Sequence, residues 1–189
     1  MKLLILIFLA HSTMLASAQE YPNEPSSQFP FGRPHPDGPK ELADFEPMIG
    51  ICKCKSVSRI SQTEWADTVM MEWKFRYIMD GWAVQDETLK ADGAHSGSIR
   101  IFNADSARWY VHYYSNAPSS GPLGVWEGNK SDGKIKLYQD SPAPNGTPGY
   151  YRLTFSDFSE DGYNWVGEWV DKTETFSYPT WKIFCKRDE

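Results

Sequence analysis

The residues of this chain that could do chemistry are charged side chains spaced between aromatic and apolar ones. Asp86 follows Trp82 and Val84 at alternate positions, and Arg100 stands two residues before Phe102. Alternate residues of a β-strand point to the same side, so these charges are expected at the inner wall or the rim of a β fold. The same spacing selects a set of five: Asp86, Arg100, His112, Arg152 and Glu168.

An inward charge in this set requires a partner of opposite sign, because an unpaired buried charge is costly. Asp86 or Glu168 would therefore pair with Arg100 or Arg152. Such a pair either orients the carboxylate or hydroxyl of a ligand or closes on itself as a structural salt bridge, and both interpretations stay open. In the first interpretation the ligand-binding residues are Trp73, Asp86, Arg100, His112, Arg152, Trp165 and Glu168.

The sequence lacks the usual catalytic and cofactor-binding patterns. It has no Gly-x-Ser-x-Gly elbow, no phosphate-binding loop and no His-Glu-x-x-His motif. The histidines beyond residue 18 are dispersed at His35, His95 and His112, so we expect neither a three-histidine metal centre nor a cofactor. A carboxylate pair such as Asp86 with Glu168 could still act as general acid and base in an apolar interior, which keeps an isomerase or hydrolase as an alternative.

Three cysteines, Cys52, Cys54 and Cys185, predict one disulfide bond. In an oxidising compartment Cys185 would pair with one of the other two, which lie two residues apart and share a strand face. The geometric window for a disulfide is narrow, so only one of them can reach Cys185. A zinc or copper site is the competing interpretation, but it needs a fourth ligand and no histidine lies near the cysteines in sequence.

The N-terminal 18 residues have the pattern of a signal peptide. Lys2 precedes an apolar run over residues 3–10, and Ala16 and Ala18 provide a small-x-small cleavage site. We therefore expect a secreted or periplasmic protein without a membrane span. Residues 19–40 are rich in proline and should form a disordered leader, and residues 41–189 should form a single domain.

The charge of the chain argues against a nucleic-acid partner. The formal net charge is −6 at pH 7, and the densest basic run, Lys182, Lys186 and Arg187, is mixed with apolar residues. Binding to phosphates requires a basic stripe that this chain does not have.

Residues 68–86, TVMMEWKFRYIMDGWAVQD, predict the central hairpin of the domain. The odd positions from 69 to 77 are all apolar or aromatic, and charged residues alternate with them beyond position 71, which is the period of a strand with one buried face. Asp80 and Gly81 favour a tight turn, after which the alternation begins again at Trp82.

Eight further short strands, separated by turn residues, are predicted along the chain. Ten strands joined mainly by hairpins indicate an antiparallel up-and-down meander, and pairing of its first and last strands closes it into a barrel without exposed edges. The cysteines agree, since they lie on the two strands that would meet. The eight strands beyond the hairpin cover residues 49–58, 98–103, 108–115, 123–129, 134–139, 150–158, 163–170 and 181–187.

The order of these motifs resembles the secreted lipocalin-like, calycin-type β-barrel proteins grouped as a domain of unknown function. The resemblance covers residues 45–187, and the tail at 172–184 departs from the family pattern. It implies a calycin-like barrel that holds a small apolar ligand. The matching residues are Gly81, Gln85 and Asp86, then Arg100, Phe102 and Trp109, and finally Arg152, Phe155, Trp165 and Glu168.

Taken together, the sequence favours a monomeric secreted barrel that binds a small hydrophobic or amphipathic molecule in an aromatic lumen. The chain contains Trp 8, Tyr 10 and Phe 10, enough rings either to line such a lumen or to fill it. The alternatives are therefore an enzyme that uses the carboxylates of the lumen and a filled barrel that acts as an extracellular interaction module.

Overall fold

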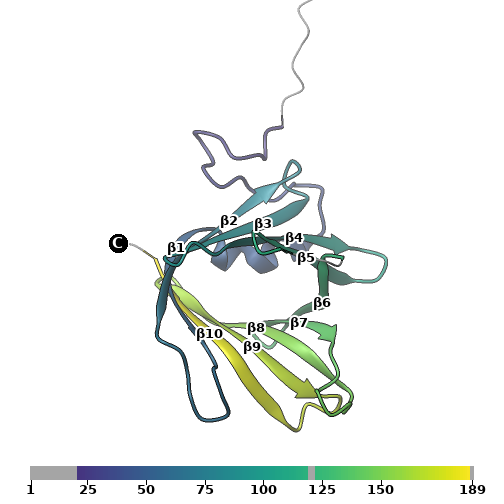
Figure 1. The fold of residues 1–189 in the computed structure, drawn as a ribbon. Coiled ribbons are helices and arrows are strands. Elements are labelled where there is room, and N and C mark those ends of the chain that lie inside the picture. Colours follow the sequence, from purple (N-terminus) through teal and green to yellow (C-terminus); the bar gives the residue numbers. More distant parts are fainter. Residues whose placement is uncertain (1–20, 119–121, 188–189) are drawn as a thin grey trace, which may run out of the picture.

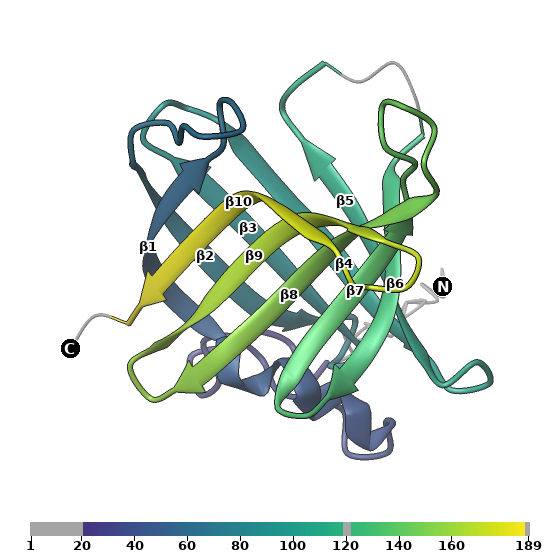
Figure 2. The same ribbon diagram turned by 90° about the horizontal axis from the view of Figure 1, so that it is seen from below.

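The computed structural model describes residues 21–118 and 122–187, and the predicted signal peptide lies outside them. These residues form a closed, ten-stranded, antiparallel up-and-down β-barrel preceded by one short 3₁₀ helix (Figures 1 and 2). The predicted fold class is confirmed. The elements are η1 (Lys40–Met48), β1 (Gly50–Ser58), β2 (Val69–Ile78), β3 (Ala83–Lys90), β4 (His95–Asn103), β5 (Arg108–Ser115), β6 (Gly124–Ser131), β7 (Lys134–Asp140), β8 (Gly149–Ser159), β9 (Gly162–Asp171) and β10 (Ser177–Lys186).

The central hairpin forms as the alternation predicts. Residues 71, 73, 75 and 77 of β2 are buried, and the residues between them are exposed or half-buried. The turn to β3 contains three residues with positive φ, namely Met79, Asp80 and Gly81. Asp and Gly tolerate this region better than most residues, which explains why the chain reverses here.

One end of the barrel is filled by side chains. Helix η1 lies across this end (Figure 2) and inserts Leu42, Phe45 and Met48, each at most 1% exposed. The ring of Phe45 packs edge-on against Trp109 at 4.8 Å between centroids and against Phe155 at 6.3 Å. This packing makes the helix end of the barrel a dry aromatic core.

Residues 21–39 belong to the segment for which composition predicts a disordered leader, and they lie against the filled end of the barrel. The amide of Tyr77 donates to the carbonyl of Phe31 at 2.8 Å, and the amide of His35 donates to the carbonyl of Gly81 at 3.2 Å. The imidazole of His35 also stacks on Trp82 at 4.8 Å. These tertiary contacts have no counterpart in the local sequence pattern, which is why composition alone does not predict them.

The barrel closes between β1 and β10. Cys54 and Cys185 face each other directly in this strand pair and form a disulfide bond. The prediction that Cys185 pairs with one of the other two cysteines is thus confirmed, and the strand register selects Cys54. Cys52 is buried on the same face of β1 and lies outside the disulfide. Over the described residues, none of the helices has the length and apolar character needed to cross a membrane.

Candidate ligand-binding cavity

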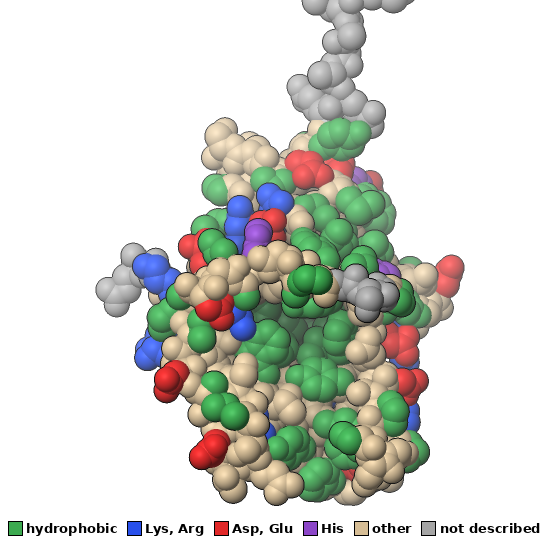
Figure 3. Space-filling model, viewed as in Figure 1, with side chains coloured by type: hydrophobic (Ala, Val, Ile, Leu, Met, Phe, Trp, Pro, Cys, Tyr) green, Lys and Arg blue, Asp and Glu red, His purple; other side chains and the backbone are tan. Residues whose placement is uncertain are grey.

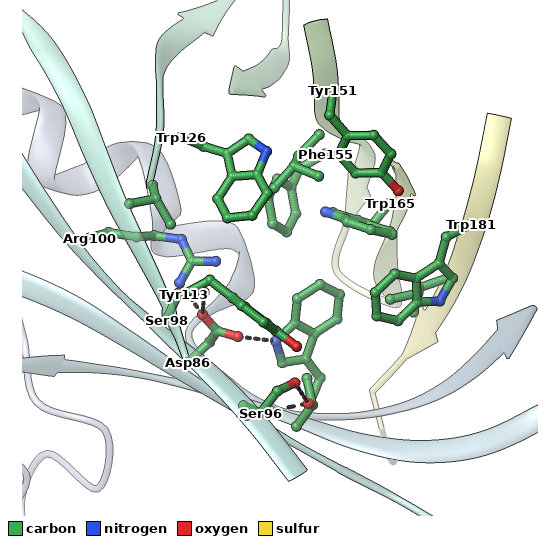
Figure 4. Close-up of a pocket in the computed structure, with 15 residues that line it drawn as sticks. Asp86, Ser96, Ser98, Arg100, Tyr113, Trp126, Tyr151, Phe155, Trp165 and Trp181 are labelled. Atoms are coloured by element: carbon green, nitrogen blue, oxygen red, sulfur yellow. Dashed lines mark hydrogen bonds and ion pairs between the residues drawn. The ribbon is translucent and has the colours of Figure 1, made fainter. Parts of the chain in front are cut away.

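The half of the barrel away from η1 contains a cavity of about 250 Å³. Figure 3 shows hydrophobic side chains gathered around a hollow on the face seen there, and Figure 4 shows the residues that line the cavity. Its walls are mainly aromatic, and its charged, serine and threonine side chains all come from β3 and β4. The lining residues are Trp73, Asp86, Thr88, Ser96, Ser98, Arg100, Val111, Tyr113, Trp126, Tyr151, Leu153, Phe155, Trp165, Trp181 and Ile183.

Asp86 is the centre of a buried polar network in this wall. Its Oδ2 accepts a hydrogen bond from the indole nitrogen of Trp73 at 2.7 Å, and its Oδ1 accepts one from the hydroxyl of Ser98 at 2.7 Å. Its Oδ1 also forms an ion pair with Arg100. Ser98 lies directly opposite Asp86 across the β3–β4 pair, and Arg100 is the diagonal neighbour of Asp86 on β4. The strand register therefore brings all these groups together.

Arg100 is held by aromatic rings as well as by Asp86. Its guanidinium carbon lies 4.9 Å from the ring centroid of Phe75, 5.1 Å from that of Phe45 and 5.8 Å from that of Phe155. A guanidinium over ring faces gains cation–π attraction, which is stronger away from water. Asp86 and Arg100 thus pair at the boundary between the filled half of the barrel and the cavity, and Nε of Arg100 is buried without a partner among the described residues.

Two pairs of rings build much of the rest of the cavity wall. Trp165 and Trp181, on β9 and β10, pack edge-on with centroids 5.0 Å apart, and Tyr113 and Trp126, on β5 and β6, pack edge-on at 6.2 Å. The indole nitrogen of Trp181 donates to the hydroxyl of Ser56 at 2.8 Å. Such interlocked rings form a rigid apolar wall.

Burial keeps two phenols of the barrel interior, Tyr151 and Tyr163, neutral over the physiological range. Burial raises the pKa of Tyr151, whose hydroxyl is 2.8 Å from that of Thr180. Burial raises the pKa of Tyr163, in the filled half, well above 10.0. Neither tyrosine supplies a negative charge to a bound molecule.

A second, wider hollow of about 860 Å³ adjoins the cavity and shares Tyr151 with it. Its walls come from the segment between β7 and β8, which includes Pro142 and Pro144, and from the facing ends of β9 and β10. Trp169 lies in this wall and donates its indole N–H to the carbonyl of Ser141 at 2.8 Å. The β7–β8 connection is thereby tied to the barrel beside the cavity.

Four of the seven residues predicted from the sequence to bind a ligand line the cavity: Trp73, Asp86, Arg100 and Trp165. The structure places the other three, Arg152, Glu168 and His112, on the outer face. In β8 the cavity is lined by Tyr151, Leu153 and Phe155, so Arg152 between them points outward. His112 alternates in the same way with Val111 and Tyr113 of β5.

Arg152 and Glu168 pair with each other on that outer face. They lie opposite in the β8–β9 register, and Nη2 of Arg152 is 2.9 Å from Oε1 of Glu168. Glu174, from the β9–β10 connection, forms a second ion pair with Arg152. Asp86 and Glu168 therefore lie on opposite sides of the barrel wall and share no site.

No group of three or more histidine, cysteine, aspartate or glutamate side chains within residues 21–118 and 122–187 is arranged to hold a metal ion. The residues that sequence reasoning missed are chiefly Tyr113, Trp126, Tyr151 and Trp181. The sequence signal that could have identified Tyr113 is the alternation along its strand. Tyr113 lies two and four residues from Val111 and Trp109, which are buried, so it shares their face.

No protein-family model matches this chain, and no curated protein sequence matches it either. The cavity and its polar network are accordingly the observations from which a function is argued.

Proposed function

We propose that this protein is a binding protein that holds one small, mostly apolar molecule in the open half of its barrel. The observation that supports this proposal is the cavity of about 250 Å³ with aromatic walls. Protein interiors are close-packed, so a void of this size has to be maintained by the fold. Binding pockets typically combine apolar walls with a few polar groups, as here.

The size of the cavity limits the ligand. Drug-sized molecules occupy pockets of roughly 300–1,000 Å³, so a ligand of this cavity has one or two rings or a short chain. The apolar walls supply affinity through the area they remove from water. The adjoining hollow beside Tyr151 offers a path for entry, or room for a substituent that projects from the cavity.

Secretion is part of the proposal. The signal-peptide pattern of residues 1–18 and the Cys54–Cys185 disulfide both fit an exported protein, because disulfides persist in oxidising compartments. The resemblance to lipocalin-like barrels supports the same function, although a shared fold does not by itself determine one.

The test is a titration of the purified protein with small lipophilic molecules, in which tryptophan fluorescence reports binding. Trp73, Trp126, Trp165 and Trp181 all line the cavity, so occupancy should change the emission. Native mass spectrometry of protein purified from its own host would show a ligand that co-purifies. Binding of at least one molecule with a one-to-one ratio is the expected result.

A pair of variants locates the binding. Val111 is 2% exposed and lines the cavity, whereas Val125 is 38% exposed and alternates with the cavity residue Trp126. Val111→Phe should reduce affinity by filling the cavity, and Val125→Phe should leave it unchanged. Equal affinities in the two variants, or no binding by the unmodified protein, would remove the basis of the proposal and favour a barrel that acts as an interaction module.

A further inference from the structure

The four tryptophans that line the cavity differ in what their indole N–H groups contact. Trp73 donates to Asp86 and Trp181 donates to Ser56, at 2.7 and 2.8 Å. The indole nitrogen of Trp126 is buried and has no partner among the described residues. No hydrogen bond joins the indole nitrogen of Trp165 to any described residue either. In Figure 4 the nitrogen edges of Trp126 and Trp165 are turned toward the space between the two rings.

The carboxylate, serine and threonine oxygens of the cavity wall already take part in hydrogen bonds within the protein. Both carboxylate oxygens of Asp86 accept hydrogen bonds from within the protein. The hydroxyls of Thr88 and Ser96 lie 2.6 Å apart and bond to each other. An indole N–H can only donate, and no hydrogen bond among the described residues uses the N–H of Trp126 or of Trp165. Of the two indole nitrogens, that of Trp126 is fully buried. A buried donor without an acceptor is unfavourable, and a ligand atom that accepts from Trp126 would remove this penalty.

The charge of the cavity restricts the ligand further. Asp86 and Arg100 are the only carboxylate and the only cationic side chain among the lining residues, and they neutralise each other. A carboxylate or ammonium group placed here would have no free counter-charge, and an uncompensated buried charge is costly. A neutral acceptor has no such cost. One carbonyl oxygen has two lone pairs and can accept from two N–H groups.

We infer that the ligand of this cavity is a neutral carbonyl compound, a small ketone, ester or amide, whose oxygen accepts hydrogen bonds from the indole N–H groups of Trp126 and Trp165. The inference rests on the proposed function and narrows it to a chemical class. It assigns these two tryptophans a role in specificity and leaves Trp73 and Trp181 in the supporting wall.

The experiment compares two probes of nearly equal shape, acetophenone and ethylbenzene, by isothermal titration calorimetry of the mature protein. Acetophenone should bind roughly tenfold more tightly, the effect of hydrogen bonds worth about 1.4 kcal/mol in total. Trp126→Phe and Trp165→Phe each remove one N–H and keep an aromatic ring. Each should lower the preference for acetophenone about threefold without weakening the binding of ethylbenzene.

Trp82→Phe is the matched control, because Trp82 lies on the β2–β3 turn outside the barrel and is 43% exposed. It should leave the preference for acetophenone unchanged. If a cavity variant fails to fold, the indole N–H resonances of the unmodified protein give a second measurement. The resonances of Trp126 and Trp165 should shift with acetophenone more than with ethylbenzene.

The outcomes separate the inference from the proposed function. Equal binding of acetophenone and ethylbenzene would overturn the inference and leave a binding cavity in place. Tighter binding of benzoate than of acetophenone would show that the site selects an anion, which also overturns it. If no probe binds and the fluorescence panel gives no response, both the inference and the proposed function fail.

Discussion

Replacement of Asp86 by Asn tests the central electrostatic argument. Asn has nearly the same shape. Its single side-chain oxygen can accept from Trp73 while its amide nitrogen donates to the hydroxyl of Ser98, but it has no charge to compensate Arg100. Both partners are buried, with Asp86 at 3% and Arg100 at 2% exposure. The variant therefore leaves a guanidinium uncompensated inside the barrel.

The expected cost is set by this burial. Removing one partner of a buried ion pair typically destabilises a protein by about 3–5 kcal/mol. The cation–π contacts of Arg100 with Phe45, Phe75 and Phe155 remain, so we expect a value near the lower end, about 3 kcal/mol. With a urea m-value of roughly 2 kcal/mol/M, the unfolding midpoint should fall by about 1.5 M.

The assay is urea unfolding monitored by tryptophan fluorescence, and Glu127→Gln is the matched control. Glu127 and Arg108 are also diagonal neighbours on adjacent strands, with a 3.1 Å ion pair, but their side chains are 46% and 45% exposed. This control should cost no more than about 1 kcal/mol. In addition, the double variant Asp86→Asn with Arg100→Met should cost about 2 kcal/mol less than the sum of the two single variants. The reasoning is refuted if Asp86→Asn is no more destabilising than Glu127→Gln.

Three further predictions concern other parts of the fold. The double variant Cys54→Ala with Cys185→Ala should lower the unfolding free energy by about 2–5 kcal/mol, toward the upper value because the bond spans 131 positions; unchanged thermal stability would contradict this. Gly81 and Gly93 both have φ of +86°, but only a Cβ at Gly81 would meet the leader backbone, at 2.4 Å. Gly81→Ala should therefore make residues 21–39 much more sensitive to protease than Gly93→Ala does, and equal digestion of the two variants would argue against the contact. Burial raises the pKa of Asp44 above 3.8, so its contribution to stability is complete below 3.8 and is lost as pH rises through the higher folded value. As the pH rises from 3.8 through the folded pKa of Asp44, Asp44→Asn should therefore become more stable relative to the unmodified protein. If the unfolding free energies of the two proteins change in parallel with pH, the raised pKa of Asp44 is refuted.

The fold was predictable because its strands carry a period-two pattern. In β2 the buried residues 71, 73, 75 and 77 are those that the alternation selects. The choice between Cys52 and Cys54 was not predictable, since both are buried on one face of β1. Only the β1–β10 register, which places Cys54 opposite Cys185, decides it.

The candidate site was predictable only where the two faces of a strand differ. Asp86 and Arg100 lie on strands whose buried and exposed sides can be distinguished. In β8, aromatic Tyr150 and Tyr151 are consecutive, so the pattern does not say whether Arg152 or its neighbours point inward. The same ambiguity affects His112 in β5, a strand with aromatic residues on both faces. Trp126 was missed because short sequence patterns do not show which residues meet across the barrel.

The closure of the barrel has a consequence for how the chain folds. Among the strands of the described residues, every hydrogen-bonded pair except β1–β10 joins strands consecutive in sequence. Nine hairpins can form from local contacts, but this last pair must wait until nearly the whole chain is in place. Until then β1 and β10 are unprotected edges that can pair with other molecules. Because Cys54 and Cys185 meet only in that pair, their oxidation marks the end of folding and prevents the edges from separating again. Aggregation during refolding should therefore depend on the speed of this single step.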